Sequence, residues 1–311
     1  MSSANGGRFY MLSLDHRSSI EKKLLGITTE PNADERARIS TLKEIIYTGF
    51  RQAVAEGAPK DACGVLVDEE FGAGIARSAK TAGFILAMPV EQTGRQEFEF
   101  EFGEEFGAHI EAFDPTFAKV LVRYNPDGDA QLNSRQEARL ARLTRWLRDH
   151  QRDLLLELLV PPTTAQLDQV DGDHDRYDRT LRPALVVRTM AALQNAGVEP
   201  RIWKVEGLDD STDCERVVTQ ARVGGRNDVE CVVLGRGADR DRVETWLRQA
   251  APVPGYIGFA IGRTLWEEAL RGHLAGRLDR AAASERIARE YRKMIDVYAA
   301  AAALDATPTA V

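Results

Sequence analysis

The sequence predicts an α/β protein folded as a (β/α)8 TIM barrel, and three observations support this prediction. Short apolar runs rich in Val, Ile and Leu alternate with longer stretches of helical period, the pattern of repeated βα units around a parallel sheet. Eight such runs occur, which favours a closed barrel over an open sheet. The length of 311 residues allows one large α/β domain or two ordinary ones, and barrels routinely reach about 250 residues as a single domain. We therefore expect one barrel domain over residues 1–311.

The expected strands coincide with these apolar runs. In chain order they are Phe9–Asp15, Gly64–Asp68, Phe84–Pro89, Lys119–Tyr124, Leu154–Val160, Arg201–Glu206, Glu230–Gly235 and Tyr256–Gly262.

The expected helices fall between the strands. They are Glu35–Glu56, Phe71–Ala82, Arg135–Asp153, Asp178–Ala196, Asp213–Val223, Asp239–Ala250 and Leu265–Leu274. In the helix expected over Asp178–Ala196, for example, Leu185, Met190 and Leu193 recur at helical spacing, and Gly197 follows as a stop signal. An alanine-rich helix is expected over about 277–304, before a short frayed tail at Asp305–Val311.

Two segments keep more than one interpretation. Gly94–Gly107 alternates aromatic residues with glutamates and fits an extra hairpin or a solvated acidic loop, of which the loop is favoured. The C-terminal helix could cap the barrel or act as a lid, or it could pack on a neighbouring subunit of a homo-oligomer.

Composition excludes several classes of protein. A net charge of −7 and a pI near 5.4, with both signs interspersed, argue against nucleic-acid and membrane-surface partners. No signal peptide or apolar run of about 18 residues is present, so a cytoplasmic protein is expected. The three cysteines have no CxxC spacing and the five histidines form no HxH or HxxxH pair, so no metal or other cofactor is expected.

The most informative residue is Lys204, which lies in an apolar run that ends at Gly207. Ammonium groups are rarely buried without a partner. Burial lowers the pKa of an amine and leaves it able to attack a carbonyl, which would make Lys204 a Schiff-base nucleophile. The alternative is a strand-end lysine whose head reaches water.

Several charged residues lie at the carboxyl ends of the expected strands, where a barrel gathers its active site. They are Asp15, Asp68, Glu91, Lys119, Glu157, Lys204 and Arg236.

Glu157 stands among six apolar residues, and burial should raise its pKa to suit proton transfer near neutral pH, unless it faces outward. Lys119 could depress the pKa of Lys204 and hold a substrate oxygen, or cap a turn. Asp15 could bind a substrate hydroxyl or cap a helix.

Two apolar strands end in Gly-Arg, at Gly235-Arg236 and Gly262-Arg263. Glycine allows backbone N–H groups to approach an anion, and arginine chelates phosphate. Both lie after the expected seventh and eighth strands, where barrels frequently bind phosphate. A salt-bridging surface arginine is the alternative, more so for Arg236 than for Arg263.

These residues resemble a known family, the class I aldolases related to tagatose-1,6-bisphosphate aldolase, and more closely the 2-deoxy-5-keto-gluconate-6-phosphate aldolase domain of inositol catabolism. The matching stretches run in order from about residue 8 to 275: LSLDHRSSIEKKLLG, LVDEEFGAGIARSAKTAGFILAMPVEQTG, KVLVRYNPDGD, LLLELLV, IWKVEG, VVLGRGAD and GFAIGRTLWEE. After the lysine the sequence departs from the pattern, since KVEG stands where Lys-Leu-Glu-Pro is typical.

The resemblance implies a role for each matching residue. Lys204 resembles the Schiff-base lysine, Glu157 the acid/base glutamate, Lys119 an assisting lysine and Asp15 the first-strand aspartate. The Gly-Arg segments resemble a phosphate site. The implied reaction is metal-independent cleavage of a phosphosugar, 2-deoxy-5-keto-gluconate 6-phosphate, to dihydroxyacetone phosphate and malonate semialdehyde.

Three other hypotheses stay open on the sequence alone. The first is an aldolase for tagatose bisphosphate or a sulfosugar phosphate, whose second anion site could use Arg17, Arg95 or Arg123. The second is a non-catalytic phosphosugar-binding barrel. The third is a magnesium-dependent, enolate-forming barrel with Asp68, Glu91, Glu157 and Glu206 as ligands.

Overall fold

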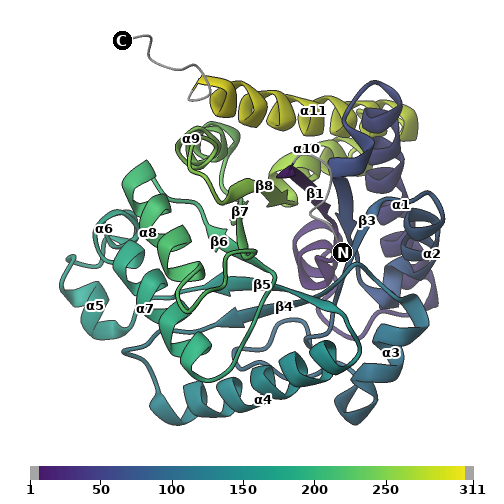
Figure 1. Ribbon diagram of the computed structural model, residues 1–311. Coiled ribbons are helices and arrows are strands. Elements are labelled where there is room, and N and C mark those ends of the chain that lie inside the picture. The colour runs from purple at the N-terminus through teal and green to yellow at the C-terminus, as the bar shows by residue number, and fades with distance from the viewer. Residues whose placement is uncertain (1–6, 305–311) are drawn as a thin grey trace.

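Eight parallel strands close into a barrel in chain order in the computed structural model, which describes residues 7–304 (Figure 1). The strands are β1 (Phe9–Ser13), β2 (Cys63–Leu66), β3 (Ile85–Pro89), β4 (Phe117–Arg123), β5 (Asp153–Leu159), β6 (Ile202–Glu206), β7 (Glu230–Leu234) and β8 (Tyr256–Ile261). The predicted (β/α)8 barrel is therefore confirmed, and every predicted strand lies within two residues of an observed one at each end.

Helices surround the barrel. They are α1 (Ala33–Ala55), α2 (Glu69–Thr81), α3 (Phe106–Phe113), α4 (Ala130–Asp149), α5 (Thr164–Asp168), α6 (His174–Thr180), α7 (Arg182–Asn195), α8 (Ser211–Ala221), α9 (Arg240–Ala250), α10 (Arg263–Leu274) and α11 (Arg280–Leu304). Figure 1 shows α1 to α3 on one side, α4 below, and α5 to α8 on the opposite side.

The strands carry apolar side chains on both faces because helices cover the barrel outside and side chains fill it inside. The inner layer consists of Phe9, Met11, Leu66, Ala87, Phe117, Leu155, Ile202, Val232 and Ala260. This layer closes the barrel below the charged residues, so the site opens only toward the carboxyl ends of the strands.

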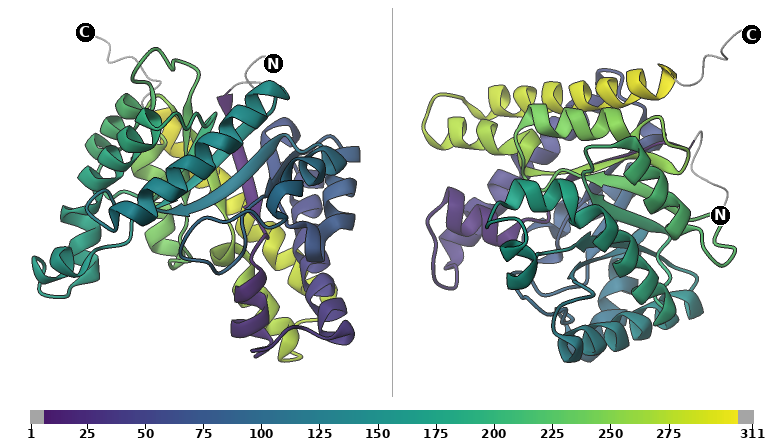
Figure 2. Two further views of the ribbon diagram at one scale, coloured as in Figure 1. Left: turned by 90° about the horizontal axis from the view of Figure 1, so that it is seen from below. Right: turned by 90° about the vertical axis from the view of Figure 1, so that its left-hand side faces the viewer.

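The C-terminal helix α11 packs against α1, α9 and α10, which places it along the side of its own barrel (Figure 2). Two of its tyrosines reach strand backbones: Tyr291 donates to the carbonyl oxygen of Tyr10 at 2.6 Å, and Tyr298 to that of Tyr256 at 2.8 Å. The helix thereby completes the outer ring. The predicted frayed tail, residues 305–311, lies outside the described residues.

Two helical predictions need correction, and a helix after β1 was missed. The helix expected over Asp178–Ala196 is divided at Leu181 into α6 and α7, because Pro183 in the first turn of α7 has no N–H to continue the earlier helix. The helix expected to reach Asp153 ends at Asp149, and Asp153 already belongs to β5. A π-helix over Ser19–Leu24, after β1, was not predicted.

The segment 94–107 is neither a full hairpin nor a solvated loop: an isolated antiparallel bridge joins Glu91 to Phe100, and a 3-10 turn over Gly103–Glu105 leads into α3. The alternation of aromatic residues and glutamates has a packing cause. Phe98, Phe100 and Phe106 are buried. Glu97 on the other face pairs with Arg135 of α4 at 2.8 Å. No helix among residues 7–304 is both long and apolar enough to cross a membrane.

Candidate active site

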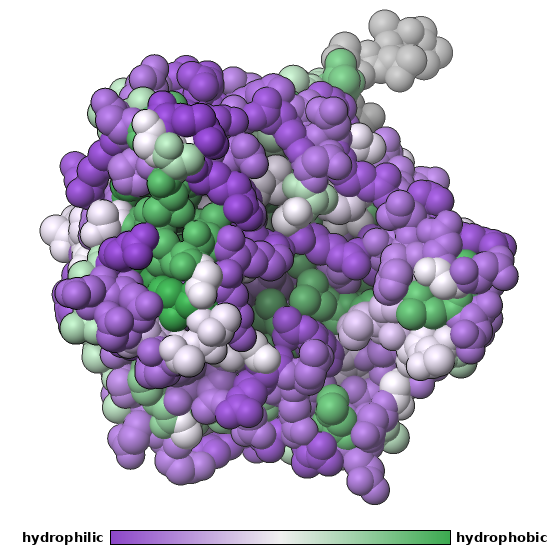
Figure 3. Space-filling view, turned by 180° about the vertical axis from the view of Figure 1, so that it is seen from behind, coloured by the Kyte–Doolittle hydropathy of each residue, from purple (hydrophilic) through white to green (hydrophobic). Residues whose placement is uncertain are grey.

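A cavity of about 260 Å³ opens at the carboxyl ends of the strands. Figure 3 shows this face, hollowed near its middle, with hydrophilic residues around the hollow and apolar ones inside it. All eight site residues predicted from the sequence line this cavity: Asp15, Lys119, Glu157, Lys204, Gly235, Arg236, Gly262 and Arg263. They come from β1 and from β4 to β8 or the loops that follow them.

Lys204 is buried in the middle of β6, with 2 % of its surface exposed. Its register partner on β5 is Glu157, and the ammonium nitrogen donates to Oε2 of Glu157 at 3.0 Å. Period-two alternation turns both side chains to the barrel interior. Lys204 is therefore not a strand-end lysine whose ammonium group reaches water, because this group lies at the floor of the cavity beside a carboxylate.

Lys119 is the third residue of β4, so it lies inside the strand and does not begin it as predicted. Its ammonium nitrogen contacts three carboxylates: Glu91 at 2.6 Å, Asp15 at 3.0 Å and Glu157 at 3.1 Å. Burial lowers the pKa of Lys119, but these three carboxylates outweigh it and hold the pKa well above its usual value. Lys119 is consequently a permanent cation.

The predicted rise in the pKa of Glu157 is wrong. Burial does raise the pKa of this carboxyl, but the ammonium groups of Lys119 and Lys204 outweigh burial and bring the pKa below its ordinary value. Asp15 behaves in the same way, since the attraction of Lys119 overcomes burial and lowers its pKa strongly. The sequence indicated the burial of Glu157 but not the two cations that share its Oε2 atom.

Glu91 and His16 complete the floor of the site. Glu91 is 8 % exposed, and burial raises its pKa although one oxygen pairs with Lys119; the other oxygen has no partner in the described chain. His16 lies 3.6 Å from Asp15 and packs edge-on against Trp266. Burial lowers the pKa of His16 to about 4, which keeps its imidazole neutral. Sequence analysis missed His16, although its place directly after Asp15 at a strand end was an available signal.

Asp68, expected on the rim, lies elsewhere. Its carboxylate caps α2 by accepting from the backbone N–H of Phe71 at 2.9 Å, and it forms a fully buried ion pair with Lys43 of α1. Lys43 also donates to the carbonyl oxygen of Leu14 at 2.6 Å. Because α1 packs on the outside of the barrel, this pair joins helix to barrel and does not line the cavity.

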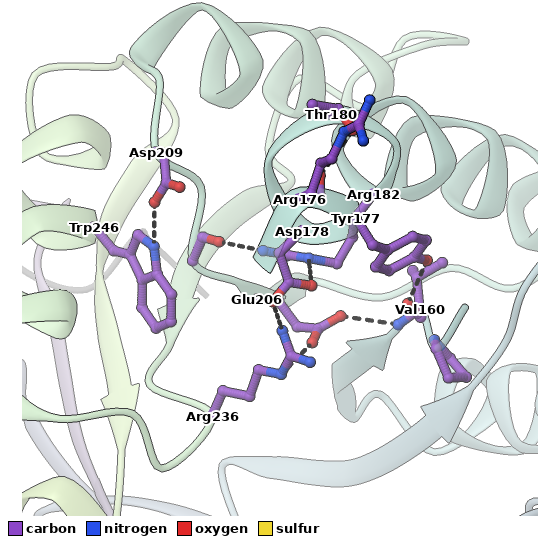
Figure 4. A network of polar contacts seen from close by, with 12 residues as sticks. Val160, Arg176, Tyr177, Asp178, Thr180, Arg182, Glu206, Asp209, Arg236 and Trp246 are labelled. Carbon is purple, nitrogen blue, oxygen red and sulfur yellow. Dashed lines mark hydrogen bonds and ion pairs between the residues drawn. The ribbon is translucent and has the colours of Figure 1, made fainter. Parts of the chain in front are cut away.

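The two Gly-Arg segments differ in their electrostatics. Arg236 pairs with Glu206 at 3.1 Å and with Asp178, as Figure 4 shows. Arg263 forms no ion pair within residues 7–304; its guanidinium donates only to the carbonyl oxygen of Arg236, at 2.9 Å, and its Nε is buried without a partner. The positive charge of Arg263 is thus available to an anion, whereas two carboxylates already compensate that of Arg236.

Two glycines explain how the loops reach this arrangement. Gly237 has a φ of +74°, a conformation that favours glycine, and a Cβ atom there would lie 2.4 Å from the guanidinium carbon of Arg263, which would have to move. A Cβ on Gly207 would lie 2.0 Å from the ring of Trp246, whose Nε1 donates to Asp209 at 2.8 Å. The glycine in KVEG is therefore required by the packing of Trp246 after β6.

Three further arginines line the cavity: Arg17, Arg95 and Arg123. Arg17 pairs with Glu101 at 3.0 Å and donates to the carbonyl oxygen of Glu91 at 3.0 Å. Arg95 and Arg123 have no ion pair in the described part of the chain. The sequence could not separate these three.

The four carboxylates considered as magnesium ligands do not converge. Asp68 pairs with Lys43, Glu91 and Glu157 with Lys119, and Glu206 with Arg236. Within residues 7–304 no three His, Cys, Asp or Glu side chains are arranged to hold a metal ion.

Comparison with known proteins places the chain in a family. Residues 3–302 match the model of a family described as "Uncharacterized protein conserved in bacteria (DUF2090)". The chain belongs to this family. No curated protein matches it. Membership in DUF2090 leaves the narrower 2-deoxy-5-keto-gluconate-6-phosphate aldolase group as a proposal.

Solved structures with the same fold are similar to this DUF2090 member over nearly its whole length. A fructose-bisphosphate aldolase from Plasmodium falciparum, in complex with TRAP and an inhibitor, has a TM-score of 0.64 at 14 % identity, covering 95 % of this chain and 92 % of its own. A Schiff-base-forming fructose-1,6-bisphosphate aldolase has 0.57 at 15 %, covering 95 % and 96 %. Cgl0159 from Corynebacterium glutamicum has 0.57 at 16 %, covering 93 % and 87 %. At these identities the similarity shows the fold.

Proposed function

We propose that the chain is a class I aldolase, a carbon-carbon lyase that cleaves a phosphorylated keto-sugar acid through a Schiff base on Lys204. The proposed substrate is 2-deoxy-5-keto-gluconate 6-phosphate, and the products are dihydroxyacetone phosphate and malonate semialdehyde. The observation that carries the proposal is the buried ammonium of Lys204 at the cavity floor, 3.0 Å from Glu157. Two similar solved structures are named as fructose-bisphosphate aldolases, one as Schiff-base-forming, which supports it.

The first half of the reaction forms the iminium. Glu157 accepts a proton from Lys204, and the free amine attacks the substrate ketone. Glu157 then returns the proton to the carbinolamine hydroxyl, which leaves as water. Lys119 stays charged because three carboxylates surround it, so it orients a substrate oxygen and does not compete as a nucleophile.

The second half breaks the carbon-carbon bond. A carboxylate of the site takes the proton of the hydroxyl on the carbon β to the iminium; that carbon becomes an aldehyde, and the bonding electrons pass into the iminium to form an enamine. Protonation of the enamine and addition of water then release dihydroxyacetone phosphate and restore Lys204. In this scheme Asp15 holds a substrate hydroxyl during these steps, and its distance of 3.0 Å from Lys119 supports the assignment.

The phosphate is assigned to the cavity wall after β7 and β8. Arg263 supplies an uncompensated charge, and the backbone near Gly235 and Gly262 allows close approach. The twelve-residue helix α10 begins at Arg263, so its positive end points to the same place. Arg236, held between Glu206 and Asp178, shapes this wall, and its carbonyl oxygen accepts the hydrogen bond from the Arg263 guanidinium.

The decisive experiment is reduction with sodium borohydride in the presence of dihydroxyacetone phosphate, followed by peptide mass spectrometry, with and without a chelator. We expect an adduct on Lys204 that is insensitive to the chelator and absent in Lys204→Arg. The chain has eight lysines, so the modified peptide can be assigned without ambiguity. A folded protein that binds the ligand without forming an adduct would overturn the aldolase and favour a phosphosugar-binding or enolate-forming barrel.

A further inference from the structure

We propose that His16 is a further catalytic residue, which delivers a proton to the enamine carbon after the carbon-carbon bond has broken. The inference deepens the proposed function and rests on it, because the enamine forms only on a Schiff base at Lys204. Without this proton the enamine cannot become the iminium that water hydrolyses. Dihydroxyacetone phosphate would then stay bound to the lysine.

The imidazole of His16 is held on two sides at the floor of the cavity. The residue lies three positions after the end of β1 and lines the cavity. Trp266 is fully buried, packs edge-on against the imidazole with ring centroids 5.4 Å apart, and donates to the carbonyl oxygen of Ser13 at 2.9 Å. The loop after β8 covers another side, since a Cβ atom on Gly262 would lie 2.4 Å from Cε1 of His16. The ring therefore has a fixed place beside the reacting groups.

The two ring nitrogens of His16 have different surroundings. Nδ1 is buried without a hydrogen-bond partner and lies 3.6 Å from Oδ1 of Asp15. Nε2 has no hydrogen bond within residues 7–304 either, but it is not enclosed, and 25 % of the side chain is exposed at the cavity. One nitrogen thus faces a carboxylate and the other faces the space for the substrate, which is the arrangement of a proton relay.

Asp15 connects the imidazole to the charged groups of the site. Its Oδ2 accepts from Lys119 at 3.0 Å, which leaves Oδ1 for Nδ1 of His16. The distance of 3.6 Å is longer than a hydrogen bond, and a proton on Oδ1 supplies the donor that shortens it. Burial raises the pKa of Asp15, but Lys119 outweighs burial and lowers it strongly. A protonated Asp15 is therefore short-lived and passes its proton to a neighbour.

The proton transfers balance without another reactant. During cleavage Asp15 takes the proton of the substrate hydroxyl that it holds, and the aldehyde departs. Nε2–H of the neutral imidazole then gives its proton to the enamine carbon, whose π electrons form the new C–H bond as the iminium returns on nitrogen. At the same time Nδ1 takes the proton from Asp15. Asp15 is again ionised, and His16 is again neutral, with its proton on Nδ1 until exchange with water restores the first tautomer.

The charges around His16 suit a neutral relay. Those that act on the imidazole belong to Asp15, Arg263, Lys204 and Glu157. Burial lowers the pKa of His16 to about 4, because the two cations largely offset the two carboxylates. The ring consequently carries one proton at neutral pH. Since the nucleophile and the arginine assigned to the phosphate both act on the ring, it borders the space for the three-carbon fragment between them.

The test is exchange of hydrogen for deuterium at the hydroxymethyl carbon of dihydroxyacetone phosphate, followed by NMR in deuterium oxide. This exchange runs the protonation step in both directions and needs no aldehyde. In His16→Gln we expect the exchange rate to fall about 10²- to 10⁴-fold, while the initial rate of borohydride trapping on Lys204 stays at the wild-type value. A ring that only supports its loop would change both rates together or neither, and either result would overturn the proposal. His174→Gln, exposed at the start of α6, is the matched control and should change neither rate.

Two further measurements keep the test decisive. Asp15→Asn should also slow exchange relative to trapping, and His16→Gln added to it should cause little further loss, because both residues lie on one proton path. Fully additive losses would overturn the relay. If His16→Gln does not fold, His16→Ala with added imidazole takes its place: restored exchange supports the relay, and no restoration overturns it.

The wild-type adduct separates this inference from the proposed function. An adduct on Lys204 together with any of these failures overturns the role of His16 alone. The absence of an adduct overturns the aldolase as well.

Discussion

Glu157 and Lys204 are register partners on neighbouring strands, and one carboxylate oxygen lies 3.0 Å from the ammonium nitrogen. A strand ladder fixes the two backbones relative to each other, so this proton-transfer distance is set by the barrel and not by a loop. Residues held on strands are positioned more exactly than residues on loops.

Replacing Glu157 with Gln keeps the shape of the side chain but removes the proton acceptor. We expect kcat for cleavage, and the initial rate of borohydride-dependent adduct formation, to fall about 10²- to 10⁴-fold. Single-turnover trapping measures the second quantity directly. Glu111→Gln, exposed on α3, is the control. An unchanged trapping rate would remove Glu157 from the proton-transfer role.

Replacing Lys119 with Met leaves Asp15, Glu91 and Glu157 close together without their shared cation. Removing one partner of a buried ionic cluster destabilises a protein by about 3–5 kcal/mol at neutral pH. Urea denaturation at pH 7.5 and at pH 5 tests this.

The stability deficit of this variant should depend on pH. In the wild type the pKa values of Asp15 and Glu157 are lowered, so their stabilisation is complete above the unfolded values near 4 and is lost as the pH falls below them. In the variant the carboxylates repel each other, and protonation relieves this. Its deficit should therefore be smaller at pH 5, and adding Glu91→Gln should recover part of it at pH 7.5.

His16 makes the fold sensitive to mild acid. Its pKa in the folded protein is about 4, below the ordinary 6.5, because burial disfavours the charged imidazolium. Below pH 6.5 the unfolded chain binds a proton that the folded chain rejects, so stability falls between pH 6.5 and about 4 and the loss is then complete. The loss can reach about 3 kcal/mol, less for a side chain that is one-quarter exposed. His16→Phe should flatten the profile of urea midpoint against pH, and a profile identical to the wild type would contradict the burial argument.

Arg263 and Arg236 should respond differently to the same substitution. Arg263→Met removes the uncompensated charge, and we expect the affinity for dihydroxyacetone phosphate to fall about tenfold or more with little change in stability. Arg236→Met leaves the buried Glu206 without its ion-pair partner and should mainly lower the free energy of unfolding. Calorimetric binding and urea denaturation of both variants separate the two effects. Weaker binding in Arg236→Met together with lower stability in Arg263→Met would contradict these two assignments.

Asp68 should matter for stability and not for chemistry. Asp68→Asn leaves Lys43 buried without its carboxylate, which should destabilise the fold by about 3–5 kcal/mol. The folded variant should form the borohydride adduct on Lys204 at the wild-type rate. Loss of adduct formation in the folded protein would return Asp68 to the rim of the site.

The barrel was predictable because each strand is buried on both faces and therefore reads as a continuous apolar run. A charged residue within such a run, as at Lys204 and Glu157, stands out for the same reason. Features that depend on contacts with residues distant in the sequence could not be predicted. The sequence does not reveal that Leu181 separates two helices, or that the phenylalanines at 98 and 100 pack inward while Glu97 reaches α4.

The wrong predictions for Asp68 and Glu157 have the same cause, because the ion-pair partners of these residues are distant in the sequence. Asp68 and Asp15 both follow an apolar strand, yet one turns to Lys43 of an outer helix and the other to Lys119 inside. The pKa of Glu157 moves in the direction opposite to its burial because two ammonium groups share one oxygen. Such relations depend on contacts between residues 25 to 104 positions apart, which no local pattern records.

The buried Gln136 anchors the loop after β3 to α4, whereas the charged residues at the floor of the site are held by the strands. The loop that contributes Arg95 is attached to α4 through this buried glutamine and through Glu97, while the lysines and carboxylates of the floor belong to β1, β3, β4, β5 and β6 or the residues directly after them. Residues 92–97 can therefore change in length or charge without disturbing the bond-breaking groups. In descendants of this chain, a new aldehyde partner could be acquired by altering that loop alone, with the same lysine performing the same cleavage.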